Sequence, residues 1–157
     1  MPNFTLSSAL NISAQAFWAQ QSFETVNHEL GPWIQMSAPS AWRELRLRDW
    51  PGGQALFKSW IMLLGWVPID RHAFGSFSFK PDSGFVEISS SWMNSAWRHE
   101  RFVEPTGKGC LLTDRVTFAP RLPLMTLQLK PIYLLVYRHR HRRLKARYAA
   151  QSHPRST

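Results

Sequence analysis

The features that mark secreted and membrane proteins are largely missing from this sequence. It has one cysteine, Cys110, which excludes an internal disulfide and gives no sign of an oxidising compartment. The N-terminus lacks a positively charged segment followed by an apolar run, so we predict no signal peptide. The longest apolar run, residues 60–69, is about half of the roughly 20 residues that a membrane helix needs. We therefore expect a cytoplasmic protein without a membrane-spanning helix.

Acidic residues are missing from the C-terminal part of the chain. Residues 1–114 carry nine basic and ten acidic residues, whereas residues 115–157 carry ten basic residues and no acidic one. The net charge of +9 therefore comes from the C-terminal end. Six of these basic residues lie close together: Arg138, Arg140, Arg142, Arg143, Lys145 and Arg147. Contact with nucleic acid or an anionic membrane is expected only here and as an accessory role, and a solvated helix end is the simpler interpretation.

The sequence does contain enough apolar material for a packed core. Its length of 157 residues is that of one ordinary domain, so we predict a single domain over residues 1–150 and a disordered tail over residues 151–157. A hydrophobic content of 44% argues against disorder in the rest of the chain. The eight tryptophans and ten phenylalanines can fill a core or line a pocket with aromatic rings.

The spacing of apolar residues locates the expected strands and helices. Residues 4–10 alternate as in a strand, and two short helices are predicted over residues 14–21 and 25–30. Strand-like runs separated by turn residues then predict an antiparallel meander over residues 56–65, 73–79, 84–90, 95–104 and 110–118. Residues 33–53 show no sustained period and are expected to be a long connection with room for one short element.

A long amphipathic helix is predicted after Arg121, and Pro131 is expected to kink it or split it in two. The order of elements predicts an α+β fold. In this fold a curved antiparallel sheet of six or seven strands wraps around the long C-terminal helix, and two short helices follow the first strand.

The turn at Gly107 and Lys108 fixes which residues of the last two strands lie opposite each other. It places Arg101 opposite Asp114 and Glu100 opposite Arg115, which are opposite-charge pairs on the two faces of the sheet. A shift of one residue would lose both pairs. Trp97, Val103, Leu112, Val116 and Phe118 make one face apolar, so this face is expected to point inward. His99, Arg101 and Asp114 then point inward with it.

A turn at residues 92–94 places Glu87 opposite His99 and adds a fourth polar residue to the inner face. Burial of Glu87, His99, Arg101 and Asp114 is costly unless they pair with one another or meet water or a ligand. Three interpretations remain open: a closed structural network, a cavity with a polar floor and aromatic walls, and a catalytic site with His99 as a base oriented by Glu87. The last lacks a visible nucleophile. No metal site is predicted, because His139 and His141 diverge on a helix.

Three segments resemble a known superfamily, and the first of them, residues 13–18 after the first strand, looks like the first helix of its members. The pattern Trp97-x-His99-x-Arg101, a glycine-containing turn and the run at residues 114–120 resemble the later strands of the START-like, SRPBCC superfamily. Residues 137–144 are similar to the end of the long last helix in some uncharacterised bacterial members. This is the helix-grip fold shared by pollen-allergen-type binding proteins, lipid-transfer START domains and polyketide cyclases. The resemblance covers nearly the whole chain.

The resemblance implies a cavity between the sheet and the C-terminal helix, filled by a hydrophobic or amphipathic small molecule such as a lipid or polyketide-like compound. The candidate ligand-binding residues are Glu87, Trp97, His99, Arg101, Asp114, Phe118 and Trp60. Because the superfamily includes binders, transporters and enzymes, a cyclase or dehydratase that uses His99 as a proton carrier is the alternative. We expect a binding protein rather than an enzyme, with no cofactor.

Overall fold

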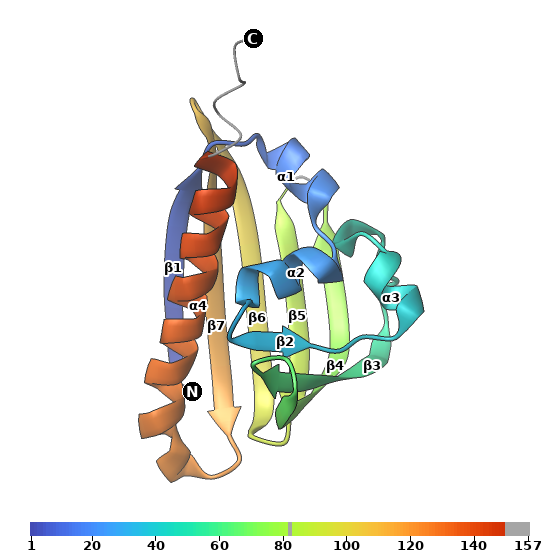
Figure 1. Ribbon diagram of the computed structural model, residues 1–157, viewed down its shortest axis with the longest axis vertical. Coiled ribbons are helices and arrows are strands. Elements are labelled where there is room, and N and C mark those ends of the chain that lie inside the picture. The colour runs from blue at the N-terminus through green and yellow to red at the C-terminus, as the bar shows by residue number, and fades with distance from the viewer. Residues whose placement is uncertain (82, 150–157) are drawn as a thin grey trace.

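A curved antiparallel sheet wraps around a long helix in the computed structural model of this chain, which describes residues 1–81 and 83–149 (Figure 1). The described residues form seven strands in the order β1-β7-β6-β5-β4-β3-β2. Their bounds are β1 Asn3–Leu10, β2 Ile34–Met36, β3 Gln54–Leu63, β4 Val67–Lys80, β5 Gly84–Ser91, β6 Asn94–Thr106 and β7 Gly109–Pro120. The predicted α+β helix-grip architecture is therefore confirmed, whereas the predicted tail at residues 151–157 lies outside the described residues.

Two short helices follow the first strand, as predicted. They are α1 (Ala14–Gln20) and α2 (Phe23–Leu30). The Ser13 hydroxyl accepts a hydrogen bond from the Ala16 N–H at the start of α1. A capping box begins α2, because the Ser22 and Thr25 side chains each accept a hydrogen bond from the other residue's backbone N–H. These caps satisfy N–H groups that a helix start would otherwise leave unpaired.

The segment at residues 33–53, predicted as a long connection with room for one short element, holds three. It contains β2, the helix α3 (Ser40–Glu44) and the 3-10 turn η1 (Leu47–Asp49). Strand β2 pairs with β3 and is the seventh strand, at the edge of the sheet. Its three residues are too few to show a period of two, and this explains why the sequence pattern did not reveal it.

Both predicted hairpin registers are confirmed. In the pair β6–β7, Arg101 lies opposite Asp114 and Glu100 opposite Arg115. In the pair β5–β6, Glu87 lies opposite His99. Arg101 and Asp114 are fully buried on the inner face. Gly84 is required where β5 meets β6, because a Cβ at this position would collide with the backbone oxygen of Arg101.

The long C-terminal helix α4 (Thr126–Ala149) follows a 3-10 turn, η2 (Pro123–Met125). The expected split at Pro131 does not occur, and the helix continues through this residue. Proline removes one hydrogen bond near the start of the helix, while buried residues further along, such as Leu144 and Tyr148, hold the later turns against the core. In the described part of the chain, no helix combines the length and apolar character needed to cross a membrane.

The helices α2 and α4 determine where the interior of the fold can hold a site. Helix α4 contacts β1, β7 and α2. Figure 1 shows α4 running along β1 and β7, and α2 lying across the same face of the sheet. One core cluster surrounds Phe17, Phe23 and Tyr148, and a second surrounds Phe118 and Tyr137.

Candidate ligand-binding cavity

A cavity of about 380 Å³ lies between the concave face of the sheet, α2 and α4. Most of its wall is apolar, with Phe23, Val26 and Leu30 from α2, Met36 from β2, Phe74 and Phe77 from β4, Phe85 from β5, and Leu129, Ile132 and Val136 from α4. This volume is within the range of roughly 300–1,000 Å³ that is typical of small-molecule sites. The interior of the fold can therefore accommodate an organic molecule of moderate size.

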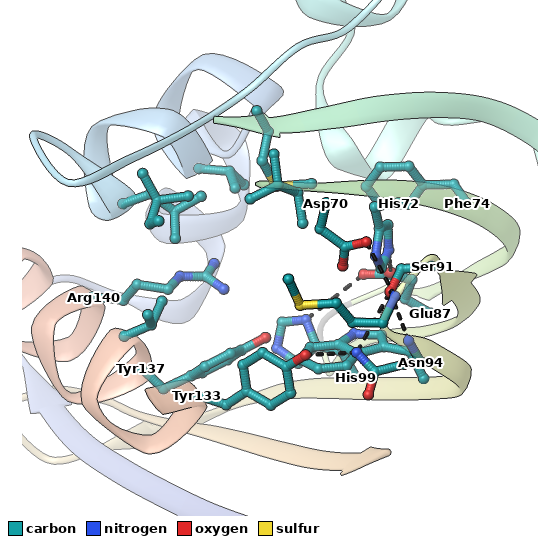
Figure 2. Close-up of a pocket in the computed structure, with 18 of the residues that line it drawn as sticks. Asp70, His72, Phe74, Glu87, Ser91, Asn94, His99, Tyr133, Tyr137 and Arg140 are labelled. Atoms are coloured by element: carbon teal, nitrogen blue, oxygen red, sulfur yellow. Dashed lines mark hydrogen bonds and ion pairs between the residues drawn. The ribbon is translucent and has the colours of Figure 1, made fainter. Parts of the chain in front are cut away.

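Polar side chains enter the cavity from two sides (Figure 2). Figure 2 shows Tyr137 and Arg140 reaching in from α4, across from the strands that carry Asp70, His72 and Glu87. The other polar lining residues are Ser91, Asn94, His99 and Tyr133. A ligand in the cavity would thus meet apolar contacts over most of its surface and hydrogen-bonding groups at specific points.

Glu87 is the centre of the polar floor. Its Oε1 atom accepts hydrogen bonds from His72 Nε2 and Ser89 Oγ, each at 2.7 Å. The Nδ1 atom of His99 lies 3.8 Å from Glu87 Oε2. Burial acts to raise the pKa of Glu87, but the hydrogen bonds and charges of His72 and His99 outweigh it and hold this pKa well below its ordinary value of 4.5. Glu87 is therefore a carboxylate at neutral pH.

Behind His99 the network continues into the protein through Asp114, Arg101 and Glu29, which do not line the cavity, and it returns to the cavity wall at Arg140. His99 Nε2 donates to Asp114 Oδ1 at 2.8 Å. Arg101 donates to both oxygens of Asp114 at 2.8 Å and to both oxygens of Glu29 at 3.1 Å. Arg140 donates to Glu29 Oε2 at 2.8 Å, so the network joins the sheet to α2 and α4.

Charge compensation keeps these inner carboxylates ionised. For Asp114, burial acts to raise the pKa, but the charge of Arg101 and the hydrogen bonds from His141 and His99 hold it well below the ordinary value. The pKa of Glu29 is lowered against the effect of its burial by the charges of Arg101 and Arg140. Each charged group here has a partner inside the protein. This part of the predicted polar patch is a closed structural network.

The candidate residues from the sequence fall into three groups. Glu87, Trp97 and His99 line the cavity. Arg101 and Asp114 lie behind His99 and do not line it. Phe118 packs against Trp97 and Tyr133 without lining the cavity, and Trp60 contacts the Trp92 ring and the Arg71 guanidinium instead.

Sequence reasoning missed several residues that the structure brings to this site. Asp70 and His72 line the cavity from β4, but the predicted strand began at residue 73. Asp70, His72 and Phe74 are two residues apart, as residues on one face of a strand are, and this spacing could have revealed them. Glu29 and Arg140 gave no such signal, because they come from helices that pair with the sheet only through tertiary packing.

The basic residues of α4 do not form one surface. Arg138, Arg142 and Lys145 are exposed, whereas Arg140 is buried against Glu29 and the Tyr137 ring. Arg143 donates to the His28 carbonyl oxygen, and the Arg147 guanidinium lies near the Tyr148 ring. The inclusion of Arg140 among the residues that would contact a polyanion is therefore wrong. Its charge is neutralised inside the protein.

The curved sheet gripping a C-terminal helix places the chain in the START-like, helix-grip fold class. A START superfamily protein from Mycobacterium smegmatis is similar, with a TM-score of 0.62 and 10% identity over 95% of this chain and 98% of that one. Protein CV1439 from Chromobacterium violaceum has a TM-score of 0.66 and 15% identity, over 93% of this chain and 96% of that one. DynU16, a protein in the dynemicin biosynthetic locus, has a TM-score of 0.54 and 11% identity, over 89% of this chain and 46% of that one.

Within this fold class, the chain belongs to the family described as a domain of unknown function, DUF8410, whose model matches residues 8–148. No curated protein matches the sequence.

Proposed function

We propose that this protein binds a hydrophobic or amphipathic small molecule in the cavity between the sheet and α4. The observation that carries the proposal is the cavity itself, which has a volume of about 380 Å³, mostly apolar walls and a polar floor. Apolar contact would supply most of the affinity, at roughly 25 cal/mol for each Å² removed from water. The START-like fold, whose members bind hydrophobic ligands, supports the same function.

The candidate residues take different roles in this proposal. Glu87, Trp97 and His99 contact the ligand. Asp114 acts through His99, because it accepts the hydrogen bond that fixes the His99 ring on the cavity wall, and Arg101 holds Asp114 in place. Phe118 supports the Trp97 ring, with 6.2 Å between the ring centroids. Contact of the ligand with Trp60 gains no support from the cavity lining, and a cytoplasmic location stays a prediction from the sequence.

The neutral dye N-phenyl-1-naphthylamine, which fluoresces in apolar surroundings, tests the proposal. Val136 lines the cavity, so Val136→Trp should fill part of it and lower dye affinity by about tenfold or more. Leu135 is its neighbour on α4 and is 65% exposed, so Leu135→Trp is the matched control and should leave affinity unchanged. Circular dichroism would show that both variants fold. Equal dye binding by both variants, or no saturable binding to the wild type, would contradict the proposal.

An enzyme of the cyclase or dehydratase type is the second candidate. The observation that favours it is the position of His99, which lines the cavity and has Glu87 on one side of its ring and Asp114 on the other. The likeness to a protein from a biosynthetic locus supports the same class. However, Nε2 of His99 is already bonded to Asp114, so only Nδ1, which lies 3.8 Å from Glu87 Oε2, could exchange a proton with a substrate. Turnover that persists in a His99→Ala variant would exclude this role for His99.

A further inference from the structure

The carboxyl group of Asp70 differs from the other buried carboxylates of this protein. Asp70 lines the cavity and is 5% exposed. Its Oδ1 atom accepts hydrogen bonds from the backbone N–H groups of Arg71 at 2.8 Å and Met93 at 3.3 Å. Its Oδ2 atom has no hydrogen-bond donor among residues 1–81 and 83–149. Figure 2 shows this carboxyl group directed from β4 into the cavity.

The contrast with the other buried acids is one of charge. Glu29 is paired with two arginines, Glu87 with histidine, and Asp114 with arginine and histidine. Asp70 has no cationic partner within the described part of the chain. The adjacent Arg71 turns away from it, with its guanidinium 5.0 Å from the centre of the Trp60 ring. A carboxylate buried without a cation is costly, so its position against the cavity requires an explanation.

A second acceptor without a donor belongs to the same end of the cavity. Asn94 is 2% exposed and lines the cavity, and its Oδ1 atom has no partner in the described residues. Its Nδ2 group donates to the Tyr133 hydroxyl at 2.6 Å, which fixes the amide. The neighbouring Met93 N–H donates to Asp70, so the two acceptors are linked through adjacent backbone. A buried acceptor without a donor destabilises the folded protein.

From these two observations we infer that the cavity selects small amphipathic molecules that carry a protonated amine, with the amine bound at Asp70. This inference rests on the proposed ligand-binding function and adds the chemical class of the ligand. An ammonium group supplies the donor that Asp70 Oδ2 lacks and also neutralises the Asp70 charge, whereas an alcohol supplies a donor alone. The rings of Trp97 and Tyr133, both in the cavity wall, can stabilise the same cation by cation–π contact.

Three probes with the same aromatic body separate these possibilities: 2-(1-naphthyl)ethylamine, 2-(1-naphthyl)ethanol and 1-naphthaleneacetate. Each would be titrated at pH 7 against the protein loaded with N-phenyl-1-naphthylamine. The amine should displace the dye at a concentration at least about tenfold lower than the alcohol or the acid, because a hydrogen bond to a charged group contributes about 1.5–3 kcal/mol. Equal displacement by the three probes would overturn the inference.

The variant Asp70→Asn should remove most of the preference for the amine while leaving the affinity for the alcohol within about twofold. Asparagine keeps the oxygen that accepts from Arg71 and Met93, and dye binding would show that the cavity is intact. Asp49→Asn, at an exposed position, makes the same change of charge and should keep the preference. If Asp70→Asn still binds the dye and still prefers the amine, the inference is overturned although the proposed cavity stands. Failure of the dye to bind the wild type would instead refute the proposed function.

Discussion

Replacement of Arg101 by methionine tests whether the buried network holds the fold together. Arg101 is fully buried and donates to both oxygens of Asp114 and both oxygens of Glu29. The variant keeps much of the side-chain volume but leaves two buried carboxylates without their shared cation. Removal of one partner from a buried ion pair typically costs about 3–5 kcal/mol. For a chain of this size that corresponds to a melting temperature lower by roughly 6–20 °C.

The matched control lies on the same strand. Arg98 is on the opposite face of β6, where its side chain is 46% exposed and pairs with Glu100. An exposed pair of this kind contributes about 0–1 kcal/mol, so Arg98→Met should change stability little. Urea unfolding followed by tryptophan fluorescence would give both values. A loss of about 1 kcal/mol or less for Arg101→Met, or equal losses for the two variants, would refute the structural role of the network.

Two further predictions concern pH and backbone packing. The pKa of Glu87 is lower in the folded state than its ordinary value of 4.5, so its contribution to stability is complete above about pH 5 and declines as the pH falls toward the folded-state pKa. Thermal midpoints measured from pH 6 to pH 2 should therefore fall less steeply in Glu87→Gln than in the wild type. Identical dependence on pH in the two proteins would contradict the lowered pKa of Glu87. Gly84→Ala should lower the thermal midpoint strongly, because the added Cβ would collide with the Arg101 backbone. Gly107→Ala should have little effect on the midpoint, because a Cβ there would meet no atom within 4 Å beyond its chain neighbours.

The elements that could be predicted from the sequence are those governed by local rules. The β6–β7 and β5–β6 registers followed from turn positions and from charge pairs such as Arg101 with Asp114, because an antiparallel hairpin fixes all opposite residues at once. The contact of Arg101 with Glu29 could not be predicted in this way. It depends on how α2 packs across the sheet, and no periodicity in the sequence encodes that distance.

The candidate site was predicted only where the hairpin registers determine which side chains point inward. The inward positions of Glu87 and His99 followed from the hairpin register. The sequence left open whether the polar patch is a closed network or the floor of a cavity, and the structure contains both. Arg101 and Asp114 belong to the closed network, whereas Glu87 and His99 belong to the wall. The strand residues before position 73 were missed because Pro68, Asp70 and Arg71 interrupt the apolar pattern.

A crystal structure of the protein with N-phenyl-1-naphthylamine tests the central claim most directly. The account predicts electron density for one dye molecule inside the cavity, in contact with Trp97 and His99 and with the inner side of α4. Exposed apolar side chains such as Leu124 and Leu127 offer a competing site on the surface. Dye bound only at such surface residues, or a cavity without dye at saturating concentration, would contradict the claim that this protein binds small molecules between its sheet and its C-terminal helix.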